Sequence, residues 1–243
     1  MNKLWTFGCS FTHGFHLDDF SNGTNLMISY KNWRPNQQLP KIWPEFVAEC
    51  LELELDNHGW PGSSVYKIFD RFCKQSHKFK KGDVVILEWT RIHRFRLYCD
   101  GYFPTVLPIF NPNIDNGSQP ISKKAIIEYQ VNRTERPWID EIYSFMKLCK
   151  ELCESIGCEL YFWSADDFIL NKENIEFKKH FKTLGLESTC DLTQFLRLKK
   201  GADTIYEETN HVVDDQQHYG EKGHRIMGEL FCDEINKYRN KEY

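Results

Sequence analysis

Residues 84–89 read Val-Val-Ile-Leu-Glu-Trp, an apolar run that a single charged residue interrupts. A run of this kind is typical of a strand that is buried on both faces of a parallel sheet. We expect two more strands at 3–7 and 159–163, and a weaker one near 188–195. These segments predict the sheet at the centre of the molecule.

Segments in which apolar residues recur at helical spacing separate the expected strands. The sequence predicts helices at 43–55, 65–79, 138–156, 173–185 and 220–238. Ser63 or Ser64 can cap the second helix at its N-terminus, and Gly157 is a natural stop for the third. Strands that alternate with helices indicate a three-layer α/β fold with a mostly parallel sheet.

The remaining stretches show no clear period. Residues 16–42 are interpreted as an irregular surface segment, and 56–64 as a turn with two Gly and one Pro. Residues 92–137 form an irregular insertion that we expect to cap the cleft. Because 41% of the 243 residues are hydrophobic and 27% are charged, the composition is that of a globular protein. We therefore expect a single domain spanning 1–243.

Charge and hydropathy limit the classes of partner. Lys and Arg total 31 and Asp and Glu total 35, so the formal net charge is -4 and a general polyanion-binding surface is not expected. Two local basic clusters, at 78–81 and 91–96, are interpreted as solvated surface, with anion contact as the alternative. No apolar run approaches the ~18 residues of a membrane helix. The first residues also lack the apolar stretch of a signal peptide, so we expect a cytoplasmic location with neither membrane nor nucleic-acid partners.

The nine cysteines are odd in number and include no Cys-x-x-Cys pair. This pattern indicates neither a disulfide framework nor a zinc ribbon. Cys149 and Cys153, four residues apart on an expected helix, are interpreted as buried apolar residues, with metal binding as the alternative. We expect no metal and no organic cofactor.

In a parallel α/β sheet the ligand binds at the carboxyl ends of the strands. Ser10 follows the first expected strand, between Gly8 and Thr12. A serine in a tight strand-to-helix turn exposes its hydroxyl and can act as a nucleophile, although it can also simply cap a helix. Small neighbours leave room for a substrate to approach.

A histidine and an aspartate that could activate this serine lie near the end of the sequence. Asp215 and His218 are three residues apart in a loop just before the last expected helix. A histidine can take the serine proton if a carboxylate fixes its tautomer and stabilises the imidazolium. The alternative is a surface loop in which the aspartate caps a helix.

These segments resemble conserved blocks of the SGNH (GDSL-like) hydrolase superfamily and lie in family order. Residues 8–12, Gly-Cys-Ser-Phe-Thr, are similar to the first block, usually Gly-Asp-Ser, with Cys9 in place of the Asp. Residues 57–64 resemble the second block, in which a Gly amide helps to form the oxyanion hole, and Gly62 is the matching position. Residues 215–218, followed by Gly-His at 223–224, resemble the last block.

The resemblance implies a flavodoxin-like α/β/α sandwich with Ser10 as nucleophile, His218 as base and Asp215 as its orienter. Oxyanion donors would come from Ser10 and Gly62. The family usually has Gly-x-Asn-Asp after the third strand, whereas here Thr90 and Arg91 follow it, and no Asn is in register. Thr90 or Arg91 could supply the missing donor.

The function that these residues predict is that of a serine esterase acting on a small-molecule or carbohydrate-linked ester. Two alternatives remain at this point. One is a catalytically weak or inactive binding module that keeps the fold, which the absent Asn favours. The other is an acyltransferase that uses the same triad, with a sugar hydroxyl in place of water. The sequence does not specify the oligomeric state.

Overall fold

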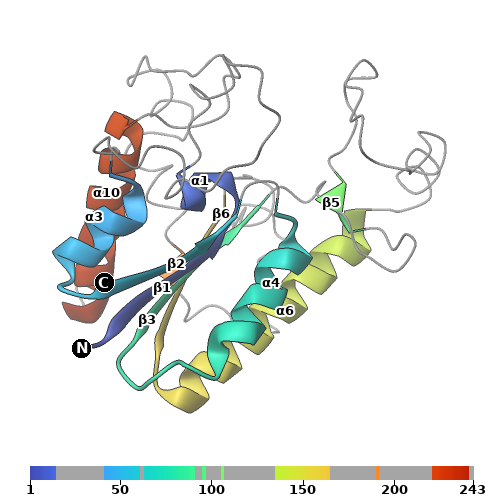
Figure 1. Cartoon of the computed structure of the whole chain (residues 1–243). Coiled ribbons are helices and arrows are strands. Elements are labelled where there is room, and N and C mark those ends of the chain that lie inside the picture. The colour runs from blue at the N-terminus through green and yellow to red at the C-terminus, as the bar shows by residue number, and fades with distance from the viewer. Residues whose placement is uncertain are drawn as a thin grey trace.

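The computed structural model describes residues 1–14, 41–60, 63–90, 95–96, 105–106, 135–164, 190–191 and 221–240. Helices cover both faces of a central sheet (Figure 1). The helices are α1 (Ser10–His13), α3 (Trp43–Cys50), α4 (Val65–Ser76), α6 (Glu135–Ile156) and α10 (Glu221–Asn240). The strands are β1 (Lys3–Gly8), β2 (Glu54–Gly59), β3 (Val84–Trp89), β4 (Phe95–Arg96), β5 (Thr105–Val106), β6 (Glu159–Ser164) and β7 (Cys190–Asp191).

The five-stranded sheet has the order β2-β1-β3-β6-β7, and every neighbouring pair is parallel. This order is the one found in flavodoxin-like sheets, in which the first and third strands are neighbours at the centre. The expected three-layer fold with a mostly parallel sheet is therefore confirmed. Strands β4 and β5 form a separate antiparallel pair within the expected insertion.

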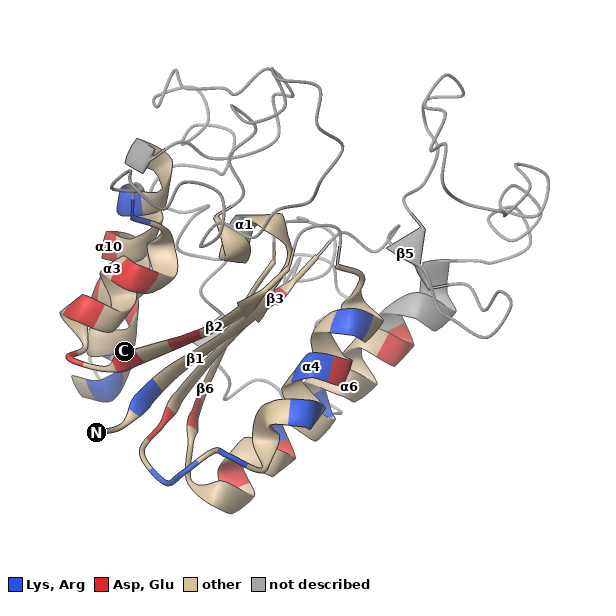
Figure 2. Ribbon diagram, in the orientation of Figure 1, with Lys and Arg blue, Asp and Glu red and all other residues tan. Residues whose placement is uncertain are grey.

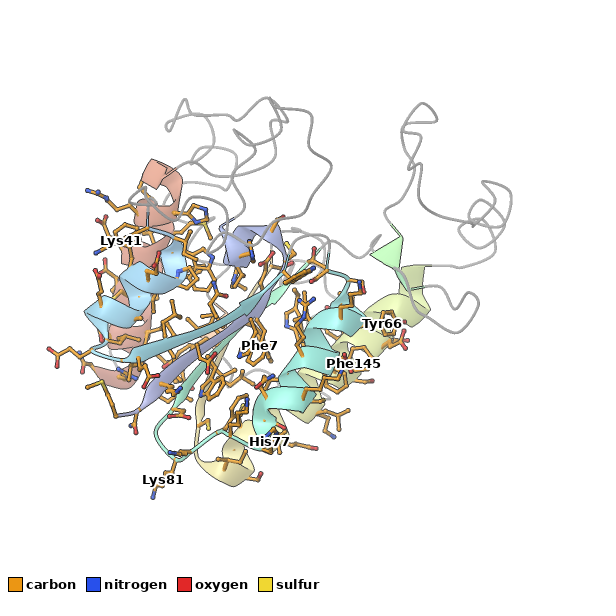
Figure 3. All side chains as sticks on the ribbon, viewed as in Figure 1. Phe7, Lys41, Tyr66, His77, Lys81 and Phe145 are labelled. Carbon is orange, nitrogen blue, oxygen red and sulfur yellow. A yellow bond between two sulfur atoms is a disulfide. The ribbon has the colours of Figure 1, made fainter. Side chains whose placement is uncertain are left out.

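Alternate residues of the central strands face two different cores. Trp5, Phe7 and Leu87 pack under α4 and α6, whereas Leu4 and Ile86 pack under α3 and α10. Figure 3 shows Phe7 on the α4 side of the sheet, and Tyr66 and Phe145 where α4 meets α6. The last two rings lie edge to face with their centroids 5.6 Å apart. The two-sided burial explains why these strands are apolar at nearly every position.

Strand β2 corrects the sequence interpretation of residues 43–64. The expected helix ends at Cys50 instead of residue 55, and 54–59 form an edge strand where a turn was expected. The strand is polar because it lies at the edge and its side chains find partners in β1 and α1. Asn57 accepts a hydrogen bond from Thr6 (3.0 Å) and donates to the carbonyl of Thr12 (2.9 Å).

Other boundaries differ less from the expectation. Helix α6 begins at Glu135 rather than residue 138, and it ends at Gly157, whose φ of 88° provides the left-handed stop that was predicted. Ser64 caps α4, accepting a hydrogen bond from the amide of Lys67. The expected irregular segment at 16–42, most of the insertion at 92–137 and the helix at 173–185 lie outside the described residues.

A disulfide between Cys50 and Cys232 corrects the expectation that the cysteines form no such bond. It joins α3 to α10 across a sequence separation of 182 residues, which local spacing could not reveal. The two helices are also joined by His224, whose Nδ1 accepts a hydrogen bond from the amide of Trp43 (3.4 Å). Cys149 and Cys153 are buried free thiols, as interpreted. Their burial raises the pKa of both thiols.

The charged residues are unevenly distributed over the layers. Lys and Arg run along α4 and into the turn before β3, whereas the charged residues of α3 are acidic (Figure 2). The basic cluster at 78–81 therefore lies at the amino ends of the strands, away from the edge at which a ligand would bind. Within the described residues, no helix combines the length and apolar character needed to cross a membrane.

Candidate active site

Ser10 lies at the carboxyl end of the central strand β1, as the sequence predicts. It is the first residue of the single helical turn α1, in which the amide of His13 donates to the carbonyl of Cys9 (3.0 Å). Gly14, with a φ of 76°, ends this turn. The Ser10 side chain is only 4% exposed, and its hydroxyl lies 3.8 Å from the sulfur of Cys9. The local fold is thus a strand-to-helix turn of the kind that carries a nucleophilic serine, but Ser10 is buried in it, whereas an exposed hydroxyl was expected.

The carboxylate of Glu88 holds this turn from the neighbouring strand β3. Its Oε2 accepts hydrogen bonds from the amides of Cys9 (3.0 Å) and Thr12 (3.2 Å), and from the Thr12 hydroxyl. Its Oε1 accepts one from the thiol of Cys9 (2.6 Å). Glu88 is fully buried, and a buried carboxylate is stable only when donors of this kind surround it.

Glu88 is the site residue that the sequence analysis missed. It was noticed only as a charged interruption of an apolar strand. That interruption was the available signal, because glutamate is almost never fully buried without partners. Its position next to the carboxyl end of a central strand also marks the edge at which ligands bind.

Gly8 is required where β1 turns into α1. A Cβ atom at this position would overlap the hydroxyl of Thr12 and Oε2 of Glu88, and would lie 2.7 Å from the Cβ of Glu88. The amide of Trp60, just after β2, donates to the Gly8 carbonyl (3.0 Å). The absence of a side chain therefore lets three segments meet at one point.

Thr90 follows β3 and places a second polar group at the same edge. It is 1% exposed, and its hydroxyl has no hydrogen-bond partner in the part of the chain that the structure describes. Residues two apart on a strand share a face, so Thr90 continues the face that bears Glu88. Buried hydroxyls normally have a partner, and an unsatisfied one at a ligand-binding edge is a candidate donor to a substrate.

The turn between β2 and α4 is fixed on both sides of the predicted oxyanion residue. Ser63 donates to the carbonyl of Trp60 (2.7 Å) and accepts from the guanidinium of Arg71 (2.8 Å). That guanidinium also lies over the Trp60 ring, 5.5 Å from its centroid. Burial lowers the pKa of Arg71 below its usual range. Gly62 itself lies outside the described residues.

The structure does not describe Asp215, His218 or Arg91. It does describe α10, which begins three residues after His218 and carries Gly223 and His224 of the last block. Met227 of this helix lies in the same core as Cys9. The helix that follows Asp215 and His218 therefore covers the face of the sheet on which Cys9 and Glu88 lie. The meeting of Ser10 with His218 stays a prediction.

A pocket of about 540 Å³ adjoins the Ser10 turn on the side of β2 and α3. Trp60 lines it, and its side chain is 44% exposed although most large aromatic residues of the described chain are buried. The rest of the lining combines polar and apolar groups: His13, Ile42, Glu45, Ala48, Glu49, Leu53, Leu55, Asn57 and Gly59. Such a mixture of one aromatic surface and several polar groups is typical of a small-molecule site.

The surroundings of His58 and the distribution of potential metal ligands bear on two other kinds of site. His58 of β2 stacks on Phe7 with ring centroids 5.2 Å apart, and its Nε2 lies 2.9 Å from the carboxylate of Asp56. Burial lowers the pKa of His58, while the charge of Asp56 opposes this shift. No group of three or more His, Cys, Asp or Glu residues that could hold a metal ion occurs among the described residues.

Comparison with known proteins identifies the fold. No protein-family model and no curated protein matches the chain. A protein assigned to the G-D-S-L lipolytic family, from Desulfitobacterium hafniense DCB-2, matches over 96% of this chain and 99% of its own, with 15% identity and a TM-score of 0.51. A catalytic mutant of an acetylxylan esterase from Geobacillus stearothermophilus matches over 96% and 94%, with 12% identity and a TM-score of 0.51.

A third match is a carbohydrate esterase family 2 enzyme with a carbohydrate-binding domain, from Corynascus thermopiles (Myceliophthora fergusii). It covers 98% of this chain and 67% of its own, with 12% identity and a TM-score of 0.51. At these identities the likeness establishes the fold and not the activity. The resemblance seen in the sequence is confirmed at this level, because the chain shares its fold with G-D-S-L lipolytic proteins and with these esterases.

Proposed function

We propose that this protein is a serine esterase in which Ser10 is the nucleophile, His218 the base and Asp215 its orienter. The observation that carries the proposal is the Ser10 turn. Ser10 stands at the carboxyl end of a central strand, in a turn that Glu88 holds through both backbone and side-chain hydrogen bonds. A turn fixed in this way presents the hydroxyl to a base without further rearrangement.

The oxyanion of the tetrahedral intermediate would be bound by donors from three turns. The amides of Ser10 and Gly62 are the first two, and the turn that contains Gly62 is anchored by Ser63 and Arg71. The third donor would be the Thr90 hydroxyl, which is buried and lacks a hydrogen-bond partner in the described part of the chain. Arg91 is the alternative third donor. Loss of one oxyanion donor typically lowers the rate by ~10²–10³. Turnover without the family Asn therefore depends on how well Thr90 or Arg91 replaces that donor.

The pocket beside Trp60 supports a small or carbohydrate-linked ester as substrate. An exposed aromatic ring can stack on the apolar face of a sugar, and neighbouring polar side chains can bind its hydroxyl groups. Two of the structural neighbours are described as acetylxylan and carbohydrate esterases. We also propose a single domain over 1–243. The expected cytoplasmic location stays a prediction, and the Cys50–Cys232 disulfide counts against it because such bonds are rare in that compartment.

The test is covalent labelling by a phosphonate probe together with hydrolysis of p-nitrophenyl acetate. Ser10→Ala should abolish labelling, whereas Ser155→Ala, an exposed serine of α6 that bonds to a backbone carbonyl, should label like the wild type. His218→Ala should lower labelling nearly as much as Ser10→Ala, since the two residues act as one unit. Asp215→Ala should lower labelling less than either of these changes. The rate should rise with pH as His218 loses its proton.

Two outcomes would favour the alternatives. A folded sample that neither labels at Ser10 nor hydrolyses any ester in a broad panel would make the protein a non-catalytic binding module. Labelling at Ser10, together with acyl transfer to a sugar hydroxyl that outruns hydrolysis, would make it an acyltransferase.

A further inference from the structure

At least four hydrogen bonds reach the carboxylate of Glu88 from the two residues that flank the Ser10 position, Cys9 before it and Thr12 after it. Two of the donors are backbone amides, so they fix the path of the chain and not only a side-chain rotamer. Glu88 is 79 residues from Cys9 in the sequence and reaches it from β3, one of the two strands that pair with β1. The turn is thus anchored to a central strand of the sheet.

The residue that precedes Ser10 differs from the one in the G-D-S-L motif. In the G-D-S-L motif, which names the family of a structural neighbour, an Asp immediately precedes the Ser. In this chain that position holds an uncharged thiol, whose sulfur lies 2.6 Å from Oε1 of Glu88 and 3.8 Å from the hydroxyl of Ser10. A carboxylate at position 9 would therefore contact the Glu88 carboxylate directly, and two such charges repel strongly at this distance.

We infer that Glu88 is the positioning residue of the nucleophile turn, and that it supplies from β3 the carboxylate that the G-D-S-L motif carries next to its serine. The inference rests on the proposed role of Ser10. In this arrangement the negative charge lies at position 88 instead of position 9, and the two side chains face each other. Only one of the two positions can hold the charge, so the effects of changing them depend on each other.

The test compares Glu88→Gln, Cys9→Asp and the double variant Cys9→Asp/Glu88→Gln by the rate at which a phosphonate probe labels Ser10, per folded molecule. Glu88→Gln should slow labelling by ~10–100-fold, because a displacement of about 1 Å at a reacting group can cost ~10². Cys9→Asp alone should slow it at least as much, through repulsion from Glu88.

The double variant should label at least ~10-fold faster than Cys9→Asp, because the introduced amide can donate to the introduced carboxylate and accept from the backbone amides. Glu234→Gln is the matched control, since Glu234 is a buried glutamate of α10 that pairs with Lys237. It should label at the wild-type rate. Wild-type labelling by Glu88→Gln, or losses that simply multiply in the double variant, would overturn the inference.

A second measurement separates this inference from the proposed function. If the wild type does not label, the proposed role of Ser10 fails, and hydrogen exchange at the amides of Cys9 and Thr12 decides the role of Glu88. Exchange should be at least ~10-fold faster in Glu88→Gln than in the wild type, since these amides lose a charged acceptor. It should be slower in the double variant than in Glu88→Gln, since the amides regain an acceptor. Unchanged exchange would refute the anchoring.

If Glu88→Gln does not fold, Thr12 provides a milder perturbation. Thr12→Val removes one donor to Glu88 with little change in shape, whereas Thr12→Ser keeps that donor. Thr12→Val should label more slowly than Thr12→Ser, and equal rates for the two variants would overturn the inference.

Discussion

Replacing Gly8 by alanine tests the close approach of β1, α1 and β3. The added methyl would meet the hydroxyl of Thr12 and the side chain of Glu88, which is held by its own hydrogen bonds and cannot swing aside freely. Overpacking of this kind costs about 1–3 kcal/mol. Displacing Glu88 far enough to break one charged hydrogen bond adds about 1.5–3 kcal/mol. We expect a total loss of about 2.5–6 kcal/mol in the free energy of unfolding.

Thermal unfolding followed by circular dichroism measures this effect. A chain of this length loses about 2–4 °C in Tm per kcal/mol, so Gly8→Ala should lower Tm by about 5–24 °C. Gly157→Ala is the matched control, because its φ of 88° is strained for alanine while its nearest contact is a flexible lysine side chain. The control should cost about 1–2 kcal/mol. A Gly8→Ala protein as stable as the control, with wild-type labelling of Ser10, would refute the described packing.

Three further predictions concern the surroundings of the site. Burial lowers the pKa of His58 below its usual 6.5, so the unfolded chain takes up this proton first and stability falls as pH drops below about 6.5. His58→Gln should lose less stability between pH 7.5 and 5.5 in urea titrations, and an identical pH slope would contradict this. Cys50→Ser should lower the unfolding free energy by about 2–5 kcal/mol, whereas Cys73→Ser, which changes an exposed free thiol, should leave it within about 0.5 kcal/mol. Trp60→Ala should raise KM for an acetylated sugar by about 3–10-fold with little change in kcat, and Trp60→Phe should lie between it and the wild type. An equal rise in KM for p-nitrophenyl acetate would instead indicate general damage to the site.

The elements that the sequence predicts well are those whose burial is continuous. Val84–Trp89 is apolar because both faces of β3 are covered, and its predicted limits coincide with the observed strand. Helix α4 was recognisable from its amphipathic spacing and its Ser64 cap. These signals are local, so a window of a few residues contains them.

The features that escaped prediction depend on partners distant in sequence. Strand β2 is polar, and its Asn57 side chain is bound by Thr6 and Thr12 of a distant segment, besides the nearby amide of Gly59. The role of Glu88 depends on residues 79 and 76 positions away, and the Cys50–Cys232 pair has no spacing rule at all. The position of Ser10 was found because its turn follows directly from a local strand. The placement of Asp215 and His218 stays a prediction.

The docking of α10 on α3 has a consequence for biosynthesis. Cys9 lies in a core that α10 completes, and the disulfide to α3 requires Cys232, near the end of the chain. A nascent chain still held by the ribosome has made β1, α1 and β3 but leaves one side of that sheet uncovered. The order of translation therefore delays the completed packing around Cys9 until α10 has emerged. On the role proposed for Ser10, the esterase site is thus the last part of the described fold to be completed.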